Sequence, residues 1–260
     1  MSTPVNTVAA GGLPVVDVTA TFPKMGAPVT EALSGKGVAV TKVANLGLPV
    51  TFVPDAGGGG GGAAFSTWEA ASVTAVTLSG GNLVATNTGT TSTDQGAKGA
   101  AANGKTSGKY YFEVTWTTVS AGNGNLGVGI GTPTSTYTGM GNNATTGDEA
   151  FQSGSTYANG SIAGSGTGGV WSSGLVMGVA VDMDNRRIWW RQSPSGIWNG
   201  NAGYSPVTNV GGLTIPAGTM VPFVTFGGSG GAVGNVMTAN FGASAFSGAV
   251  PSGFTSGWTA

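Results

Sequence analysis

From Phe65 to the C-terminus, short runs of β-branched and aromatic residues alternate with clusters of glycine, asparagine, serine and threonine. Such runs between turn-forming clusters are typical of β-strands. Apolar residues do not recur at the 3.6-residue spacing of an amphipathic helix, so no helix is predicted. The pattern predicts an all-β fold, either a closed barrel or a two-sheet sandwich. We expect strands at Val73–Leu78, Leu83–Thr86, Lys109–Thr118, Leu126–Ile130, Val176–Asp182, Arg187–Arg191, Met220–Phe226 and Val236–Phe241.

Composition excludes several classes of protein. The 260 residues include no histidine and no cysteine, which removes Cys/His zinc sites, Ser-His-Asp or Cys-His nucleophiles and disulfides. The net charge of −1 provides no basic footprint for nucleic acid. No apolar run reaches the roughly 18 residues of a membrane-spanning helix. We therefore expect no cofactor, no metal, no nucleic-acid partner and no membrane insertion. Although 50 residues are glycine, seven tryptophans and 40% hydrophobic residues argue for a packed core.

Six consecutive glycines, Gly57–Gly62, separate a short N-terminal segment from the rest of the chain. That segment holds four degenerate copies of a Gly-x-Pro/Ala-Val unit, and each copy reads as a short or edge strand. So small a segment needs partners to be stable, which predicts an anchor or oligomerisation element; an extended tail with accidental similarity is the alternative. We expect an anchor over residues 1–56, a Gly-rich linker over 57–67 and a sandwich over 68–260. The candidate anchor residues are Pro14, Val15, Pro28, Val29, Val40, Pro49 and Val50.

Three glycine motifs resemble nucleotide-binding signatures. Residues Gly99–Thr106 fit the P-loop pattern, but the motif needs a buried strand before it and a helix after it, and neither is expected here. The segments Gly122–Gly127 and Gly164–Gly169 fit the dinucleotide fingerprint without a βαβ unit around them. We interpret all three as loops.

The predicted hairpin at 176–191 has two different faces. Ile188 and Trp190 share the face expected in the core, whereas Arg187, Trp189 and Arg191 share the other. Asn185-Arg186 is expected to form a two-residue turn. We also expect Trp189→Ala to cost clearly less stability than Trp190→Ala.

Acidic pairs offer two further candidate sites. Asp182 and Asp184 could serve a glycosidase, although a solvated face paired with Arg187 and Arg191 is favoured. Asp148-Glu149 could help to bind calcium, but a solvated turn is favoured because the ligand spacing of a known loop is missing.

Aromatic residues in or beside loops suit sugar rings, which stack on flat apolar faces. Tyr137, Trp171, Trp198 and Tyr204 are of this kind, and the alternative is that they fold onto their own sandwich, as is expected for Trp198. The candidate ligand-binding residues are Tyr137, Trp171, Arg187, Trp189, Arg191 and Tyr204.

Seven segments follow one another in order along residues 68–258: Ser107–Val114, Leu126–Gly131, Gly178–Trp190, Ile197–Gly200, Pro222–Val224, Ala239–Gly242 and Pro251–Phe254. Together they resemble the sequence motifs of SPRY domains. The resemblance implies a bent, concanavalin-like sandwich of two antiparallel sheets (B30.2-type) that binds ligands through its loops. The glycine-rich loops resemble SPRY-like modules on bacteriophage virion proteins, and the N-terminal repeat resembles the leader of phage fibre or appendage proteins.

These observations lead to a functional expectation. We expect a non-enzymatic virion structural protein of a tailed phage, a tail fibre, spike or head fibre, made in the host cytoplasm. Its N-terminus would dock to other virion proteins, as a homo-oligomer with a trimer favoured, and its sandwich would bind a host cell-surface glycan or a protein. A capsid decoration or baseplate or collar protein without receptor binding is the alternative, and a polysaccharide depolymerase is less favoured.

Overall fold

The structure is a computed structural model that describes residues 64–89, 95–120, 126–137, 147–151, 154–158, 161–165, 172–226 and 233–260. The chain divides into two units between Gly62 and Ala63, and every described residue belongs to the second unit. The candidate anchor residues, the six-glycine tract and Trp171 lie outside the described residues. The predictions made for them remain predictions.

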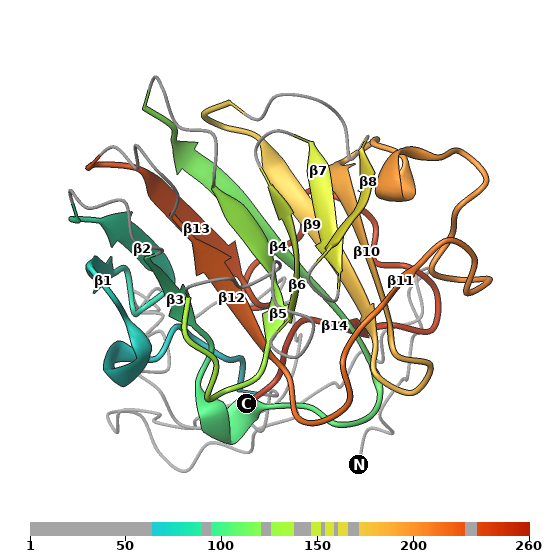
Figure 1. Ribbon diagram of the computed structural model, residues 1–260, viewed down its shortest axis with the longest axis horizontal. Helices are drawn as coiled ribbons and strands as arrows, with labels where there is room; N and C mark the ends of the chain where they lie inside the picture. Colours follow the sequence, from blue (N-terminus) through green and yellow to red (C-terminus); the bar gives the residue numbers. More distant parts are fainter. Residues whose placement is uncertain are drawn as a thin grey trace, which may run out of the picture. The chain divides into compact units, whose positions relative to one another are not determined.

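One sheet has eight strands (Figure 1) and contains most of the strands that the sequence predicts. Its pairing is antiparallel except for the last strand, β14 (Thr255–Ser256), which runs parallel to β4. The order across the sheet is β1 (Val76–Ser79), β2 (Val84–Asn87), β13 (Val236–Asn240), β4 (Lys109–Thr118), β9 (Val176–Asp182), β10 (Arg187–Ser193) and β11 (Leu213–Thr214).

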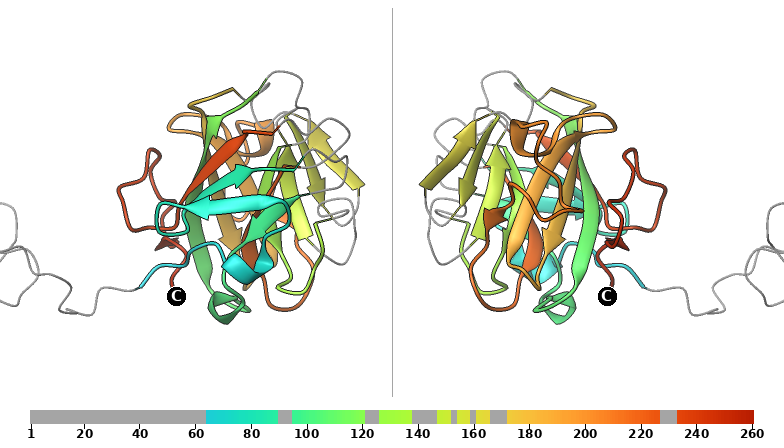
Figure 2. Two further views of the ribbon diagram at one scale, coloured as in Figure 1. Left: turned by 90° about the vertical axis from the view of Figure 1, so that its left-hand side faces the viewer. Right: turned by 90° about the vertical axis from the view of Figure 1, so that its right-hand side faces the viewer.

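The second sheet has six strands, all antiparallel, and packs against the first (Figure 2). Three short 3₁₀ turns complete the described elements: η1 (Ala70–Ser72), η2 (Ala101–Asn103) and η3 (Trp198–Gly200). No helix within the described residues is long and apolar enough to cross a membrane. The strand order is β3 (Gly96–Lys98), β12 (Val221–Thr225), β5 (Gly127–Gly131), β6 (Gly147–Phe151), β7 (Ser155–Ala158) and β8 (Ser161–Ser165).

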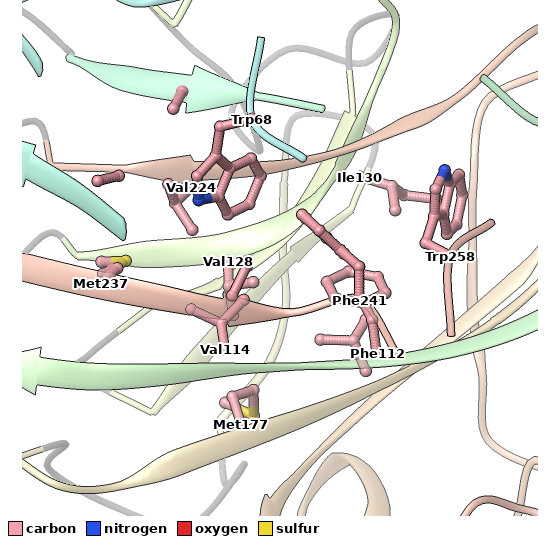
Figure 3. Close-up of a cluster of buried hydrophobic side chains, with 14 of the residues drawn as sticks. Trp68, Phe112, Val114, Val128, Ile130, Met177, Val224, Met237, Phe241 and Trp258 are labelled. Atoms are coloured by element: carbon pink, nitrogen blue, oxygen red, sulfur yellow. The ribbon is translucent and has the colours of Figure 1, made fainter. Parts of the chain in front are cut away.

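The core lies between the two sheets. Phe112, Val114 and Trp116 alternate along β4 toward it, as period-2 patterning requires. They meet residues of the opposite sheet such as Val128 and Val224 (Figure 3). The two sheets are separate and each has its own edge strands, so the fold is a sandwich and the barrel alternative is excluded.

The strand predictions fall into two groups. Lys109–Thr118 and Val176–Asp182 have the predicted bounds, and the other six predicted strands are present with ends shifted by a few residues. Strands β3, β6, β7, β8, β11 and β14 were not predicted, because their glycine, serine and threonine content resembles that of the loops. Asp148 and Glu149 lie in β6, so their placement in a loop was wrong.

The first and last described residues lie side by side. Phe65 pairs with Thr259, and the amide of Ala260 donates to the carbonyl of Ala64 at 2.6 Å. Residues 64–66, which the sequence assigned to the linker, therefore already belong to the sandwich.

Candidate functional site

The outer face of β4, β9 and β10 is covered by the protein itself. Tyr111, Ala180 and Trp189 form a second, smaller apolar cluster on this face and are fully buried. Trp198 from η3 and three residues of the segment after β13, Phe246, Val250 and Phe254, pack over them. Trp189 is therefore as buried as Trp190, and its ring is not exposed as a ligand-binding residue requires.

Glu113 fastens this covering segment to the sheet. The carboxylate is buried and accepts hydrogen bonds from the backbone amides of Ser247 and Gly248, both at 2.8 Å. It also accepts from the hydroxyls of Tyr111 at 2.7 Å and Ser193 at 2.9 Å. Burial raises the pKa of Tyr111 to about 12, so the phenol keeps its proton and donates. Four neutral donors thus hold a buried carboxylate and, with it, the cover over Trp189.

The acidic pair of the hairpin is not an open pair of carboxylates. Asp182 is fully buried, lies 2.9 Å from the ammonium of Lys109, and accepts from the backbone and side-chain amides of Asn185. Burial opposes ionisation, but the bonds from Asn185 and Lys109 prevail and lower the pKa of Asp182. Asp182 is opposite Arg187 in the sheet, but its ion pair is with Lys109, and Arg187 and Arg191 donate to Thr214 and Ala249, so the expected charge pairing with the two arginines was wrong. The two-residue turn was also wrong, because this register leaves a four-residue connection, 183–186.

The P-loop-like segment has one of the two neighbours that a phosphate site needs. Strand β3 ends at Lys98, directly before Gly99, so the expectation of no preceding strand was wrong. The short η2 turn lies within the motif, and the chain enters strand β4 soon after it, so no helix N-terminus is directed at the loop. In the second fingerprint, Gly164 lies within β8, and most of both fingerprints falls outside the described residues.

The candidate aromatic residues that the structure describes pack against the protein itself. Tyr137 is 5% exposed, packs against Phe223, and donates its hydroxyl to the carbonyl of Ser72. Tyr204 is half-buried, and its ring lies against the backbone of Gly211. Trp198 is half-buried too, with the guanidinium of Arg191 4.5 Å from its ring centroid. None of the described aromatic side chains whose burial is known is exposed.

The cationic side chains of the sandwich serve its own structure. Those of Arg186 and Arg187 donate to Gly218 and Thr214, and that of Arg191 donates to the carbonyl of Ala249 at 2.6 Å. Lys98, Lys105 and Lys109 contact carbonyl oxygens, the Tyr110 ring and Asp182, respectively. Within the described ranges no three acidic residues lie together as a metal site requires. The guanidinium groups of Arg187 and Arg191 thus bond to oxygen atoms of the protein itself rather than extending toward a ligand.

Most of the connection from β10 to β11, residues 197–210, lies at the surface, and we call this segment the platform. It includes η3 and precedes β11, at the edge of the sheet that ends in β10 and β11 (Figure 1). Asn199, at a φ of 45°, accepts from the amide of Trp190 at 2.8 Å and donates to the carbonyl of Gly211 at 2.9 Å. Trp189 donates its indole N–H to the carbonyl of Val210 at 2.9 Å. These bonds fix the platform to β10 at both of its ends.

Glycine is required where the platform rejoins the sheet. Gly211 has a φ of 74°, and a Cβ there would lie 2.0 Å from the Tyr204 ring. Any other residue would be strained and would also displace that ring. Within the platform, Ser205 and Val210 exchange backbone hydrogen bonds at 3.0 Å in each direction, so the turn between them is also closed.

Three large aliphatic side chains stand out from this ordered backbone. Ile197, Val207 and Val210 are 50%, 53% and 46% exposed. In the part of the chain that the structure describes, the other large hydrophobic side chain exposed to this degree is Val233, beside β13 at the far side of the same sheet. The platform was not predicted as a site, because its exposed residues are aliphatic and form no aromatic or charged motif. The lack of charge from Gln192 onward was the available signal.

Comparisons with known proteins support the fold. No family model matches the sequence, and no curated protein is similar to it. The SPRY domain of human HERC1 matches with a TM-score of 0.50 and 15% identity over 66% of this chain and 96% of that one. A human SPRY domain matches with a TM-score of 0.47 and 12% identity over 66% and 99% of the two chains. Residues 64–260 therefore adopt a SPRY-like β-sandwich fold.

Proposed function

We propose that this chain is a non-enzymatic interaction protein whose SPRY-like sandwich contacts another protein through the platform. The observation that carries the proposal is the exposure of Ile197, Val207 and Val210 on a backbone held by Asn199 and Trp189. A surface that is already ordered loses little conformational freedom when it binds, so more of its apolar burial becomes affinity. Exposed apolar side chains that gather on one surface mark interaction sites.

A protein partner fits this surface better than a glycan does. Sugar rings stack on flat aromatic faces, whereas the exposed platform residues are β-branched aliphatics. Tyr137 and Trp189 are buried, and Tyr204 and Trp198 are half-buried against the protein. Aliphatic side chains of this shape interdigitate with others of their kind, as in the core of a protein interface.

We also propose where the protein works. Residues 1–56 mount the sandwich on the virion of a tailed bacteriophage, made in the host cytoplasm. The Gly-Pro-Val repeat and the glycine tract that follows it support this assignment. So do the absence of cysteine and the low share of charged residues, 7%. Because the platform contacts protein, we favour a structural or decorating role, in which the sandwich binds neighbouring proteins of the particle, over recognition of a host glycan.

The attachment is tested by complementing a phage that lacks the gene with full-length variants. Replacing Val15, Val29, Val40 and Val50 by Asp puts a charge into each repeat unit. The matched control puts four Asp residues outside the units, at Thr7, Thr19, Ser34 and Ala44. We expect the wild-type and control chains, but not the repeat variant, to be recovered on purified particles by immunoblot.

Two outcomes would contradict the proposal. Absence of the wild-type chain from purified particles overturns the virion assignment. Recovery of the repeat variant at the wild-type level overturns the anchor role of residues 1–56. Both variants must remain soluble and give the wild-type far-UV circular dichroism spectrum, which separates loss of attachment from loss of folding.

A further inference from the structure

The last part of the chain is without ionisable side chains. Arg191 is the final charged side chain in the sequence, and residues 192–260 contain no Asp, Glu, Lys or Arg. This stretch includes the platform, β11–β14 and the segment that covers Trp189. Proteins ordinarily keep charges of both signs on their surfaces, since these prevent unwanted association. The platform, with three exposed aliphatic side chains, has no such protection of its own.

Charge decides which partner such a surface accepts. A charged patch repels its own copy, but a neutral apolar patch does not, so it can pack against itself across a two-fold axis. Depletion of charge at the centre and a polar rim are characteristic of protein interfaces. The platform is depleted of charge in this way: it exposes Ile197, Val207 and Val210 and contains no charged residue. The nearest cations in sequence before it, Arg187 and Arg191, donate to Thr214 and Ala249.

We infer that the platform packs against the platform of a second copy of this chain. The inference rests on the proposed protein-contacting role and names the partner. Three features support it: the contact is neutral on both sides, its backbone is fixed beforehand by Asn199 and Trp189, and no charged side chain in the platform opposes it.

Sedimentation of the full-length chain over a concentration series tests the contact. The double variant Val207→Lys/Val210→Lys brings like charges together across a two-fold axis, which opposes association strongly. We expect the concentration-dependent association to weaken by about tenfold or more. Val233→Lys is the matched control, because Val233 is 51% exposed but lies outside the platform, and it should associate like the wild type. Far-UV circular dichroism checks that all three chains are folded.

Cross-linking provides a direct readout because the chain has no cysteine. With a bismaleimide, full-length Val207→Cys should give a covalent dimer in good yield, and Val233→Cys should give much less. Equal association of wild type and double variant, or equal cross-linking at the two positions, overturns the inference. If the double variant fails to join particles while the wild type never self-associates, the partner is a different protein. That result rejects the second copy and leaves the proposed function standing.

Discussion

Trp189 and Trp190 are adjacent in β10 and point to opposite faces of the same sheet, yet both are fully buried. Trp190 lies in the core between the sheets and donates its indole N–H to Val128 of the opposite sheet at 3.0 Å. Trp189 lies beneath the platform and the segment after β13. The comparison teaches that alternation along a strand assigns the faces but does not say which faces other segments will cover.

The largest effect is expected at the inter-sheet core. Trp190→Ala should lower the free energy of unfolding by about 3–5 kcal/mol, because a large buried side chain is replaced by a cavity between two rigid sheets. Urea or guanidinium denaturation followed by circular dichroism measures it. A loss below about 1 kcal/mol would show that the site is not close-packed.

Trp189→Ala tests whether the outer cluster is a second core. We expect a loss of about 3 kcal/mol, at the lower end of the range for such substitutions, because the loops above can move into part of the space. Hydrogen exchange should also increase in the platform, which loses the bond from the indole to Val210. The sequence alone predicted a clearly smaller cost than for Trp190, and a small loss with unchanged exchange would support that earlier expectation.

Glu113→Gln should loosen the cover without unfolding the sandwich. The amide nitrogen of glutamine cannot accept a bond, so at least one of the four donors around position 113 loses its partner. The expected cost is about 1–3 kcal/mol, with faster hydrogen exchange at Ser247 and Gly248. Glu69→Gln is the control, because the Glu69 carboxylate accepts one long bond, at 3.4 Å and exposed, and its loss should change little. Equal effects of the two substitutions would argue against the fastening role of Glu113.

The smallest effect is an acid-dependent one at the β4–β9 contact. The folded protein lowers the pKa of Asp182 below 3.8, so the stabilisation is present above that value and is lost as pH falls through the folded pKa. The urea concentration at the unfolding midpoint of the wild type should decrease as the pH is lowered below about 4. Asp182→Asn should reduce this dependence on pH. Asp184→Asn, which removes an exposed carboxylate two residues further on, should retain it. A wild-type slope in Asp182→Asn would assign the acid sensitivity to other groups.

Asp182 also shows why partners in a sheet are hard to predict from sequence. Strand β9 is internal, so Asp182 is opposite both Arg187 on β10 and Lys109 on β4. The hairpin partner is visible in the sequence, but the distant strand is not, and Lys109 takes the ion pair. Arg187 instead turns to Thr214 of β11. The bonds that order the platform were hidden for the same reason, because they join it to Trp189 and Trp190, which are not local to it in sequence.

Local pattern by itself determined the long strands and their faces. The bounds of β4 and β9 and the inward direction of Trp190 follow from side chains that alternate every two residues. Tertiary structure alone decided the pairing of the glycine-rich strands β6, β7 and β8, the burial of Trp189, and the exposure of Ile197 and Val207. The physical reason is that periodicity is a property of neighbouring residues, whereas burial depends on which remote segments pack over them.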